Sequence, residues 1–112
     1  MSYRLIFAAV LALACTVGGG LARADDDSYA LAINGHAFEP LELAIPAGKK
    51  IVLTVKNLNS TPSEFESADL NREKVVVGGG TITVFIGPLR PGSYEFFDDF
   101  NADTPHGHIV AK

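Results

Sequence analysis

The sequence has only one cysteine, Cys15, and only one methionine, Met1. Both lie within the first 24 residues, which have the character of a secretory signal peptide. If that segment is removed after Ala24, the exported chain cannot form a disulfide, bind a metal through a thiolate or use a cysteine nucleophile. Sulfur ligands of every kind are then excluded from any metal site in the exported chain.

The first 24 residues combine the features of a secretory signal peptide. Arg4 provides a positive charge, residues 5–17 form an uncharged apolar run, and residues 21–24 place small side chains before a cut at Asp25. The run is shorter than the ~20 residues that a membrane-spanning helix needs, so an anchor is the weaker interpretation. Residues 12–15 loosely resemble a lipoprotein cleavage site, which leaves lipidation of Cys15 as a minor alternative. We therefore expect a periplasmic domain formed by residues 25–112.

Basic residues are scarce in the expected domain. Arg4 and Arg23 leave with the signal, so seven of the 9 basic residues remain against all 13 acidic ones, a formal net charge of −6. This charge argues against nucleic acid and anionic lipid as partners, and it is compatible with collecting cations. A nucleophile elbow, a phosphate-binding glycine loop and an HExxH motif are also missing, which removes the enzyme classes that depend on them.

Helical periodicity is missing after residue 24, and an alternation of apolar residues takes its place. Apolar side chains occupy every second position in residues 41–45, 51–55, 82–86 and 94–96. Each set would line one face of a half-buried strand. Breaks rich in glycine and proline separate these segments, as at residues 46–48, 78–80 and 91–92. Many short strands at this spacing predict a single all-β domain, an antiparallel sandwich or barrel.

Three motifs resemble those of cupredoxins in order and spacing. They are FEPLELAIPAG at residues 38–48, PGSYEF at 91–96 and GHIV at 107–110. The resemblance covers almost all of residues 29–112 and implies a cupredoxin-like Greek-key β-sandwich.

A narrower similarity concerns EFES at residues 64–67, LNREK at 70–74 and FFDDF at 96–100. These are similar to a periplasmic subgroup that contains the cupredoxin domain of EfeO-type iron-uptake proteins and small proteins encoded beside Ftr-type iron permeases. The similarity implies a metal-binding accessory of iron uptake that works with a membrane iron permease. The metal would be copper or iron. Assistance in ferrous iron oxidation and formation of a homodimer are left open.

The chain departs from blue-copper cupredoxins at the ligands themselves. A blue-copper site needs two imidazoles, a thiolate and a weak axial sulfur ligand. Ser63 and Glu64 stand where the first histidine would lie, and Asp98 stands where the cysteine would end its strand. No methionine follows it. A blue type 1 copper centre and plastocyanin-like electron transfer are therefore not expected.

Acidic residues offer alternative ligands. Glu64 and Glu66 are two positions apart on a predicted strand, so their side chains share one face, roughly 7 Å apart at Cα. They either converge on one cation or form an exposed polar face. Asp98 shares the face of Phe96 at the inner edge of the sandwich, where a carboxylate is costly unless it is paired, hydrogen-bonded or metal-bound. Asp99, in the loop that follows, is a further candidate ligand or a turn cap.

The three histidines are the remaining candidate ligands. His106 lies in the loop that supplies the last ligands of a cupredoxin and could bind the ion held by Asp98. His108 follows in the predicted final strand, as an edge or surface residue. His36, beside the turn at residues 34–35, is either a separate ligand or merely exposed.

A site made of the two glutamates, Asp98 and His106 would be oxygen-rich with one nitrogen. Such donors suit Fe(III), Mn(II) or tetragonal Cu(II). The carboxylate charge also favours Fe(III) over Fe(II), which would ease oxidation of ferrous iron. Two other interpretations stay open. One is a metal-free interaction module whose acidic patch docks onto a permease or another protein, and the other is a copper scavenger or chaperone that uses the three histidines.

Overall fold

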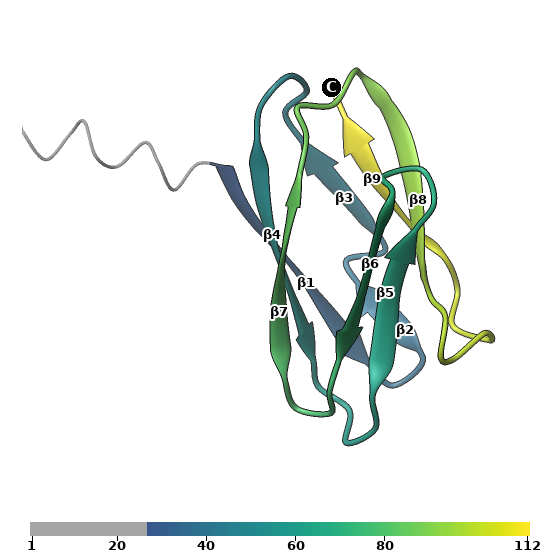
Figure 1. Cartoon of the computed structure of the whole chain (residues 1–112). Coiled ribbons are helices and arrows are strands. Elements are labelled where there is room, and N and C mark those ends of the chain that lie inside the picture. Colours follow the sequence, from purple (N-terminus) through teal and green to yellow (C-terminus); the bar gives the residue numbers. More distant parts are fainter. Residues whose placement is uncertain (1–26) are drawn as a thin grey trace, which may run out of the picture.

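Nine β-strands form two facing sheets in the computed structural model, which describes residues 27–112 (Figure 1). The predicted signal peptide, residues 1–24 with Cys15, lies outside the described residues. The strands are β1 Ser28–Asn34, β2 Ala37–Glu39, β3 Glu42–Ile45, β4 Ile51–Asn57, β5 Ser63–Ser67, β6 Arg72–Val76, β7 Thr81–Ile86, β8 Gly92–Asp98 and β9 Gly107–Ala111. This two-sheet sandwich confirms the all-β class that the alternating pattern predicts.

The order of strands shows how the chain moves between the two sheets. One sheet has the order β2-β1-β4-β7, and the other has the order β3-β9-β8-β5-β6. The neighbours are antiparallel, as predicted, except that β1 pairs with β4 and β3 pairs with β9 in parallel. Parallel neighbours cannot be joined by a tight turn, so the chain reaches them only after crossing to the other sheet.

The space between the sheets is filled by side chains from the predicted alternating positions. β4 contributes Ile51, Leu53 and Val55, which are at most 1% exposed. Phe96 of β8 packs against Phe65 of β5, with ring centroids 5.4 Å apart. Burial of each such side chain contributes about 1.5–3 kcal/mol, so these positions hold the two sheets together.

The alternation is a poor guide at Leu41, which was expected on the inward face of a strand. β3 begins only at Glu42, and Leu41 is 47% exposed. The carbonyl of Leu41 accepts the backbone N–H of His108 at 2.9 Å. Leu41 therefore extends the backbone pairing with β9 instead of filling the core.

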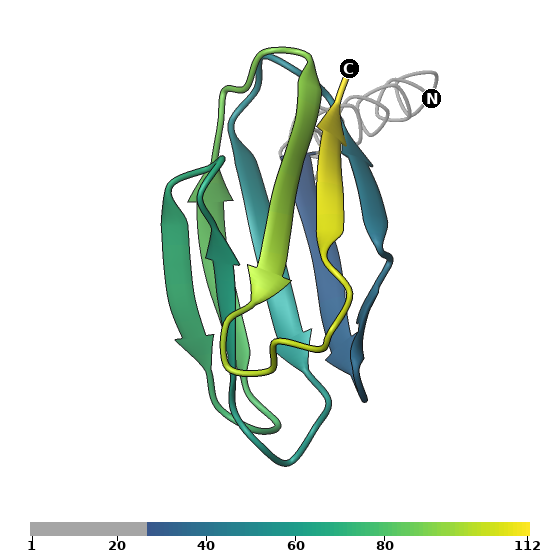
Figure 2. The ribbon, with the colours of Figure 1, turned by 90° about the vertical axis from the view of Figure 1, so that its right-hand side faces the viewer.

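β5 is the strand from which the candidate site is built. It lies between β8 and β6 in the five-stranded sheet. The connection from β8 to β9 runs along the end of the sandwich at which β5 begins (Figure 2). Residues just after β8 therefore lie next to the first residues of β5. Within residues 27–112, we find no helix with the length and apolar character needed to cross a membrane.

Candidate metal centre

The side chains of β5 alternate between the core and the outer face of its sheet. Ser63, Phe65 and Ser67 are at most 1% exposed and face the interior. Period-2 geometry then directs Glu64 and Glu66 to one common face, as the sequence predicted, and this is the outer face of the sheet. Glu64 is nevertheless only 8% exposed, because neighbouring groups cover it.

Neighbouring elements bring further carboxylates to this outer face. Glu66 lies directly opposite Glu73 of β6 in the antiparallel register. The backbone N–H of Asp99 donates to the carbonyl of Glu64 at 3.0 Å. One ligand oxygen from each of Glu64, Glu66 and Asp99 lies within 4.8 Å of the other two. We call these three residues, with Glu73 beside them, the carboxylate cluster.

The cluster raises the pKa values of its own members. Burial is the largest cause of a rise in the pKa of the Glu64 carboxyl from 4.5 to about 7, and hydrogen bonds to Glu73 and Asp99 and repulsion from Glu73 and Glu66 also contribute to this rise. Burial also raises the pKa of Glu66, with repulsion from Glu73 and Asp99 adding to it. Like charges placed opposite each other on a sheet are destabilising, so this grouping is unfavourable without a proton or a cation.

Basic side chains close to the carboxylate cluster are engaged elsewhere. Arg72 and Lys74 of β6 donate to the carbonyls of Phe85, at 2.9 Å, and Thr83, at 3.2 Å, on β7. Within the described part of the chain, the ion pairs all involve histidines, and none reaches the cluster. The charged groups that shift the pKa of Glu64 are thus other carboxyls, and no ion pair among residues 27–112 neutralises it.

Asp98 has a different environment from the one shared by the glutamates. It is 2% exposed, and its Oδ1 accepts the backbone N–H groups of Glu64 and Phe100, each at 3.0 Å. Its Oδ2 accepts the side-chain amide of Asn101 at 2.8 Å. Hydrogen bonds therefore satisfy this buried carboxylate. The sequence had left hydrogen bonding, ion pairing and metal binding open for it. The structure brings Asp99, and not Asp98, to the two glutamates.

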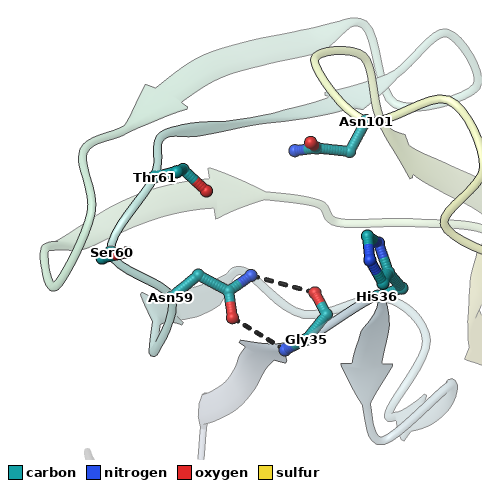
Figure 3. Close-up of a pocket in the computed structure, with 6 residues that line it drawn as sticks. All are labelled: Gly35, His36, Asn59, Ser60, Thr61 and Asn101. Atoms are coloured by element: carbon teal, nitrogen blue, oxygen red, sulfur yellow. Dashed lines mark hydrogen bonds between the residues drawn. The ribbon is translucent and has the colours of Figure 1, made fainter.

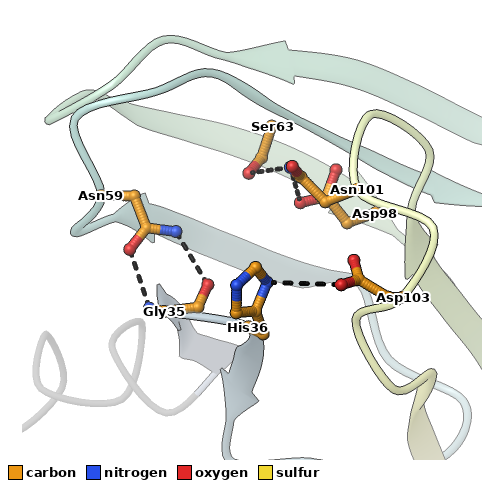
Figure 4. Close-up of polar contacts among 7 residues, drawn as sticks. All are labelled: Gly35, His36, Asn59, Ser63, Asp98, Asn101 and Asp103. Carbon is orange, nitrogen blue, oxygen red and sulfur yellow. Dashed lines mark hydrogen bonds and ion pairs between the residues drawn. The ribbon is translucent and has the colours of Figure 1, made fainter.

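A hydrogen-bonded network occupies the positions at which a blue-copper protein would carry ligands. Ser63 and Asp98 take the places expected for the first histidine and the cysteine, and Asn101 donates to both, at 3.4 Å to Ser63 Oγ (Figure 4). Residues 27–112 contain neither cysteine nor methionine. These residues do not fit a thiolate-bound type 1 copper ion. Asn101 was not singled out from the sequence, although an asparagine three residues after Asp98 is a common turn signal.

His36 lies away from the carboxylate cluster. Its Nδ1 is 3.9 Å from Asp103 Oδ2, and both side chains are about three-quarters exposed. It lines an open pocket of about 250 Å³ beside Gly35, Asn59 and Asn101 (Figure 3). Asn59 both accepts from and donates to the backbone of Gly35, at 2.7 and 2.9 Å, so two of the lining residues are already hydrogen-bonded to each other.

His106 is also separate from the carboxylate cluster and from Asp98. Its Nδ1 lies 3.0 Å from Glu95 Oε2, and its ring stacks on Phe97 with centroids 5.0 Å apart. His108 faces the same Glu95 oxygen at 3.9 Å. The candidate ligands predicted from the sequence therefore lie in four separate places in the structure.

Comparisons with known proteins agree with this architecture. The family model described as a cupredoxin-like domain matches residues 4–111. An uncharacterized protein of Rickettsia prowazekii is 42% identical over 82 residues, which is 73% of this chain and 66% of that protein. The chain thus spans slightly less than two thirds of the length of that relative.

Several solved structures are similar to this chain in fold but distant from it in sequence. Auracyanin from Roseiflexus castenholzii is 16% identical, with a TM-score of 0.65 over 77% of this chain and 97% of that chain. A purple cupredoxin from Nitrosopumilus maritimus is 20% identical, with a TM-score of 0.58 over 75% and 99%. Amicyanin from Paracoccus versutus is 14% identical, with a TM-score of 0.60 over 77% and 82%. With the family match over almost its whole length, this chain belongs to the cupredoxin-like domain family.

Proposed function

We propose that this protein is an exported metal-binding accessory of iron uptake, which holds iron, or copper in its place, at the carboxylate cluster. The observation that carries the proposal is the convergence of Glu64, Glu66 and Asp99, whose ligand oxygens lie within 4.8 Å of one another. A bound cation would offset the repulsion among these groups and would supply a counter-charge that no ion pair of residues 27–112 brings to them.

The chemistry of the donors favours a hard cation. Carboxylate oxygens suit Mn(II) and iron, whereas soft metals prefer thiolates. Three carboxylates also stabilise Fe(III) more than Fe(II), because the Coulomb attraction grows with the charge of the ion. The cluster is therefore better suited to retain ferric iron, or to accept ferrous iron that is being oxidised, than to carry single electrons.

The proposed place of the protein in iron uptake is supported by its sequence motifs. The narrower similarity at residues 64–67, 70–74 and 96–100 includes Glu64, Glu66, Glu73 and Asp99, which are the members of the cluster. A membrane iron permease, or another periplasmic component of iron uptake, would be the recipient of the metal. Export through the predicted signal peptide would place the protein in the compartment where such a permease collects its ion.

Metal titration of the exported protein tests this proposal. Mn(II) and ferric citrate are titrated into the wild type, a Glu64→Gln/Glu66→Gln variant and a Glu39→Gln/Asp103→Asn variant, which removes the same charge from exposed positions elsewhere. We expect the first variant to lose affinity by about tenfold or more and the control to retain it.

A result in which the cluster variant keeps its metal affinity would contradict the proposal. Equal binding by the wild type and both variants would overturn the proposal, and the alternative of a metal-free module that docks on a partner protein would take its place. Circular dichroism of each variant without metal shows whether its fold is intact.

A further inference from the structure

A second group of ligating side chains lies on the outer face of the five-stranded sheet, at β8 and β9. Glu95 of β8 lies opposite His108 of β9 in the antiparallel register. His106 precedes β9, two positions before His108. Because strand side chains alternate, the two imidazoles share the outer face, while Gly107 between them is buried against the Phe96 ring.

One carboxylate oxygen faces both imidazoles. Glu95 Oε2 is 3.0 Å from His106 Nδ1 and 3.9 Å from His108 Nε2. The three side chains are each 45–48% exposed, so solvent ions reach them and they can adjust without disturbing the core. Stacking on Phe97 holds the His106 ring, with an interplanar angle of 24°. One carboxylate oxygen thus lies within 3.9 Å of a nitrogen from each of the two imidazoles.

A further carboxylate lies in the same row of the sheet. β3 pairs with β9 in parallel, and its register places Glu42 beside His108. His108 therefore stands between Glu95 on one neighbouring strand and Glu42 on the other, all on the outer face. An exposed histidine paired with one carboxylate gains little stability, so simple ion pairing gives no strong reason for two histidines and two carboxylates to gather here.

The donor types indicate which metal would bind. Imidazole nitrogen suits copper and zinc, and Cu(II) has the highest affinity for mixed nitrogen and oxygen donors among the divalent ions of the first transition row. We propose that Glu95, His106 and His108 form a second metal site, selective for Cu(II), that is separate from the carboxylate cluster. The site uses no thiolate.

The chain contains its own control for this site. His36 is the only other histidine, and it faces a single carboxylate, Asp103, at 3.9 Å. His36 and Asp103 reproduce one exposed imidazole–carboxylate pair without the second imidazole. If copper binding requires two imidazoles beside one carboxylate, it should depend on His106 and His108 but not on His36.

The experiment is a Cu(II) titration of the exported protein, followed by calorimetry and electron paramagnetic resonance. We expect His106→Ala/His108→Ala to lower the Cu(II) affinity by about tenfold to a hundredfold and to remove the nitrogen hyperfine pattern. His36→Ala and Glu64→Gln/Glu66→Gln should leave the nitrogen-ligated copper signal and the affinity of that copper unchanged, which separates this site from the carboxylate cluster. Thermal unfolding of the metal-free variants confirms that they fold.

Three results would each overturn the second site. One is wild-type copper affinity in His106→Ala/His108→Ala, and another is an equal loss in His36→Ala. The third is a copper spectrum that shows oxygen ligands alone. The last result, together with a loss in Glu64→Gln/Glu66→Gln, would assign copper to the carboxylate cluster and leave the proposed function standing.

Discussion

The side-chain amide of Asn101 donates to Asp98 Oδ2 at 2.8 Å, at the end of β8 where a blue-copper protein would carry its cysteine. The backbone N–H of Asn101 also donates to the Asp98 carbonyl at 3.2 Å, which closes a turn. In this protein, hydrogen bonds that Asp98 accepts from Glu64, Phe100 and Asn101 hold the loop between β8 and β9 to the start of β5. That loop then carries Asp99 to the carboxylate cluster.

Replacing Asp98 with alanine should destabilise the fold more than it affects metal binding. The change leaves the backbone N–H groups of Glu64 and Phe100 without their acceptor, and an unsatisfied buried donor costs roughly 1–3 kcal/mol. We expect a loss of about 2–3 kcal/mol in urea unfolding. Asp98→Asn keeps an acceptor oxygen and should lose less. Unchanged stability combined with lost Mn(II) binding would instead identify Asp98 as a ligand.

The alternation of apolar residues predicts the strands and much of the core, but it does not predict which strands pair with each other in the sheets. Ile51, Leu53 and Val55 are buried as their period-2 spacing predicts. The parallel pairing of β3 with β9 joins Ile45 to Ala111, and no local pattern connects residues so far apart. Such pairing depends on how the whole chain crosses between the sheets, which short-range spacing does not encode.

The stability of the metal-free protein should fall as pH rises between about 4.5 and 7. The folded state raises the pKa of Glu64 to about 7, so it keeps a proton there that the unfolded chain has already released. Where the folded state binds more protons, the free energy of unfolding decreases with pH. Above pH 7 both states are ionised and this contribution levels off.

Urea unfolding of the metal-free protein at pH 5, 6, 7 and 8 measures this dependence. Glu64→Gln removes the titrating group, so the variant should show a flatter profile and should be more stable than the wild type at pH 8. Glu39→Gln, at an exposed position, serves as the control. A wild-type stability that rises from pH 5 to pH 7 would contradict the electrostatic strain assigned to Glu64.

Strand periodicity predicts the positions of some residues in the candidate site, but not that of Asp99. The common face of Glu64 and Glu66 follows from their spacing, and the inward direction of Asp98 follows from that of Phe96. Asp99 lies beyond the end of β8, so its position depends on the turn that Asp98 and Asn101 form. Turn geometry of this kind, and not residue type, decides which of two adjacent aspartates joins the glutamates.

Asn57 should be one of the most important polar residues for stability. It is fully buried, and its Nδ2 donates to the carbonyls of Thr61 and Val76 at 2.8 and 3.1 Å. Its Oδ1 accepts the backbone N–H of Asn59 at 2.9 Å. Asn57→Ala should cost about 2–3 kcal/mol, because it leaves several buried backbone groups unpaired. Asn59→Ala, whose side-chain bonds are exposed, is the matched control and should cost about 1 kcal/mol or less in the same urea titration.

Binding of Mn(II) to the carboxylate cluster should release a proton and should strengthen with pH. Below pH 7 the Glu64 carboxyl is mostly protonated in the metal-free protein, because its pKa is raised to about 7. A metal ion needs the ionised form, so binding must displace that proton, and the affinity should rise by up to about tenfold per pH unit until it levels off near pH 7. Calorimetry in two buffers of different ionisation enthalpy counts the released proton directly. At pH 6 we expect close to one proton per ion, and at pH 8 close to none. Affinity that does not change between pH 5.5 and pH 8 would mean that Mn(II) binds without Glu64, and the carboxylate cluster would then not be the binding site.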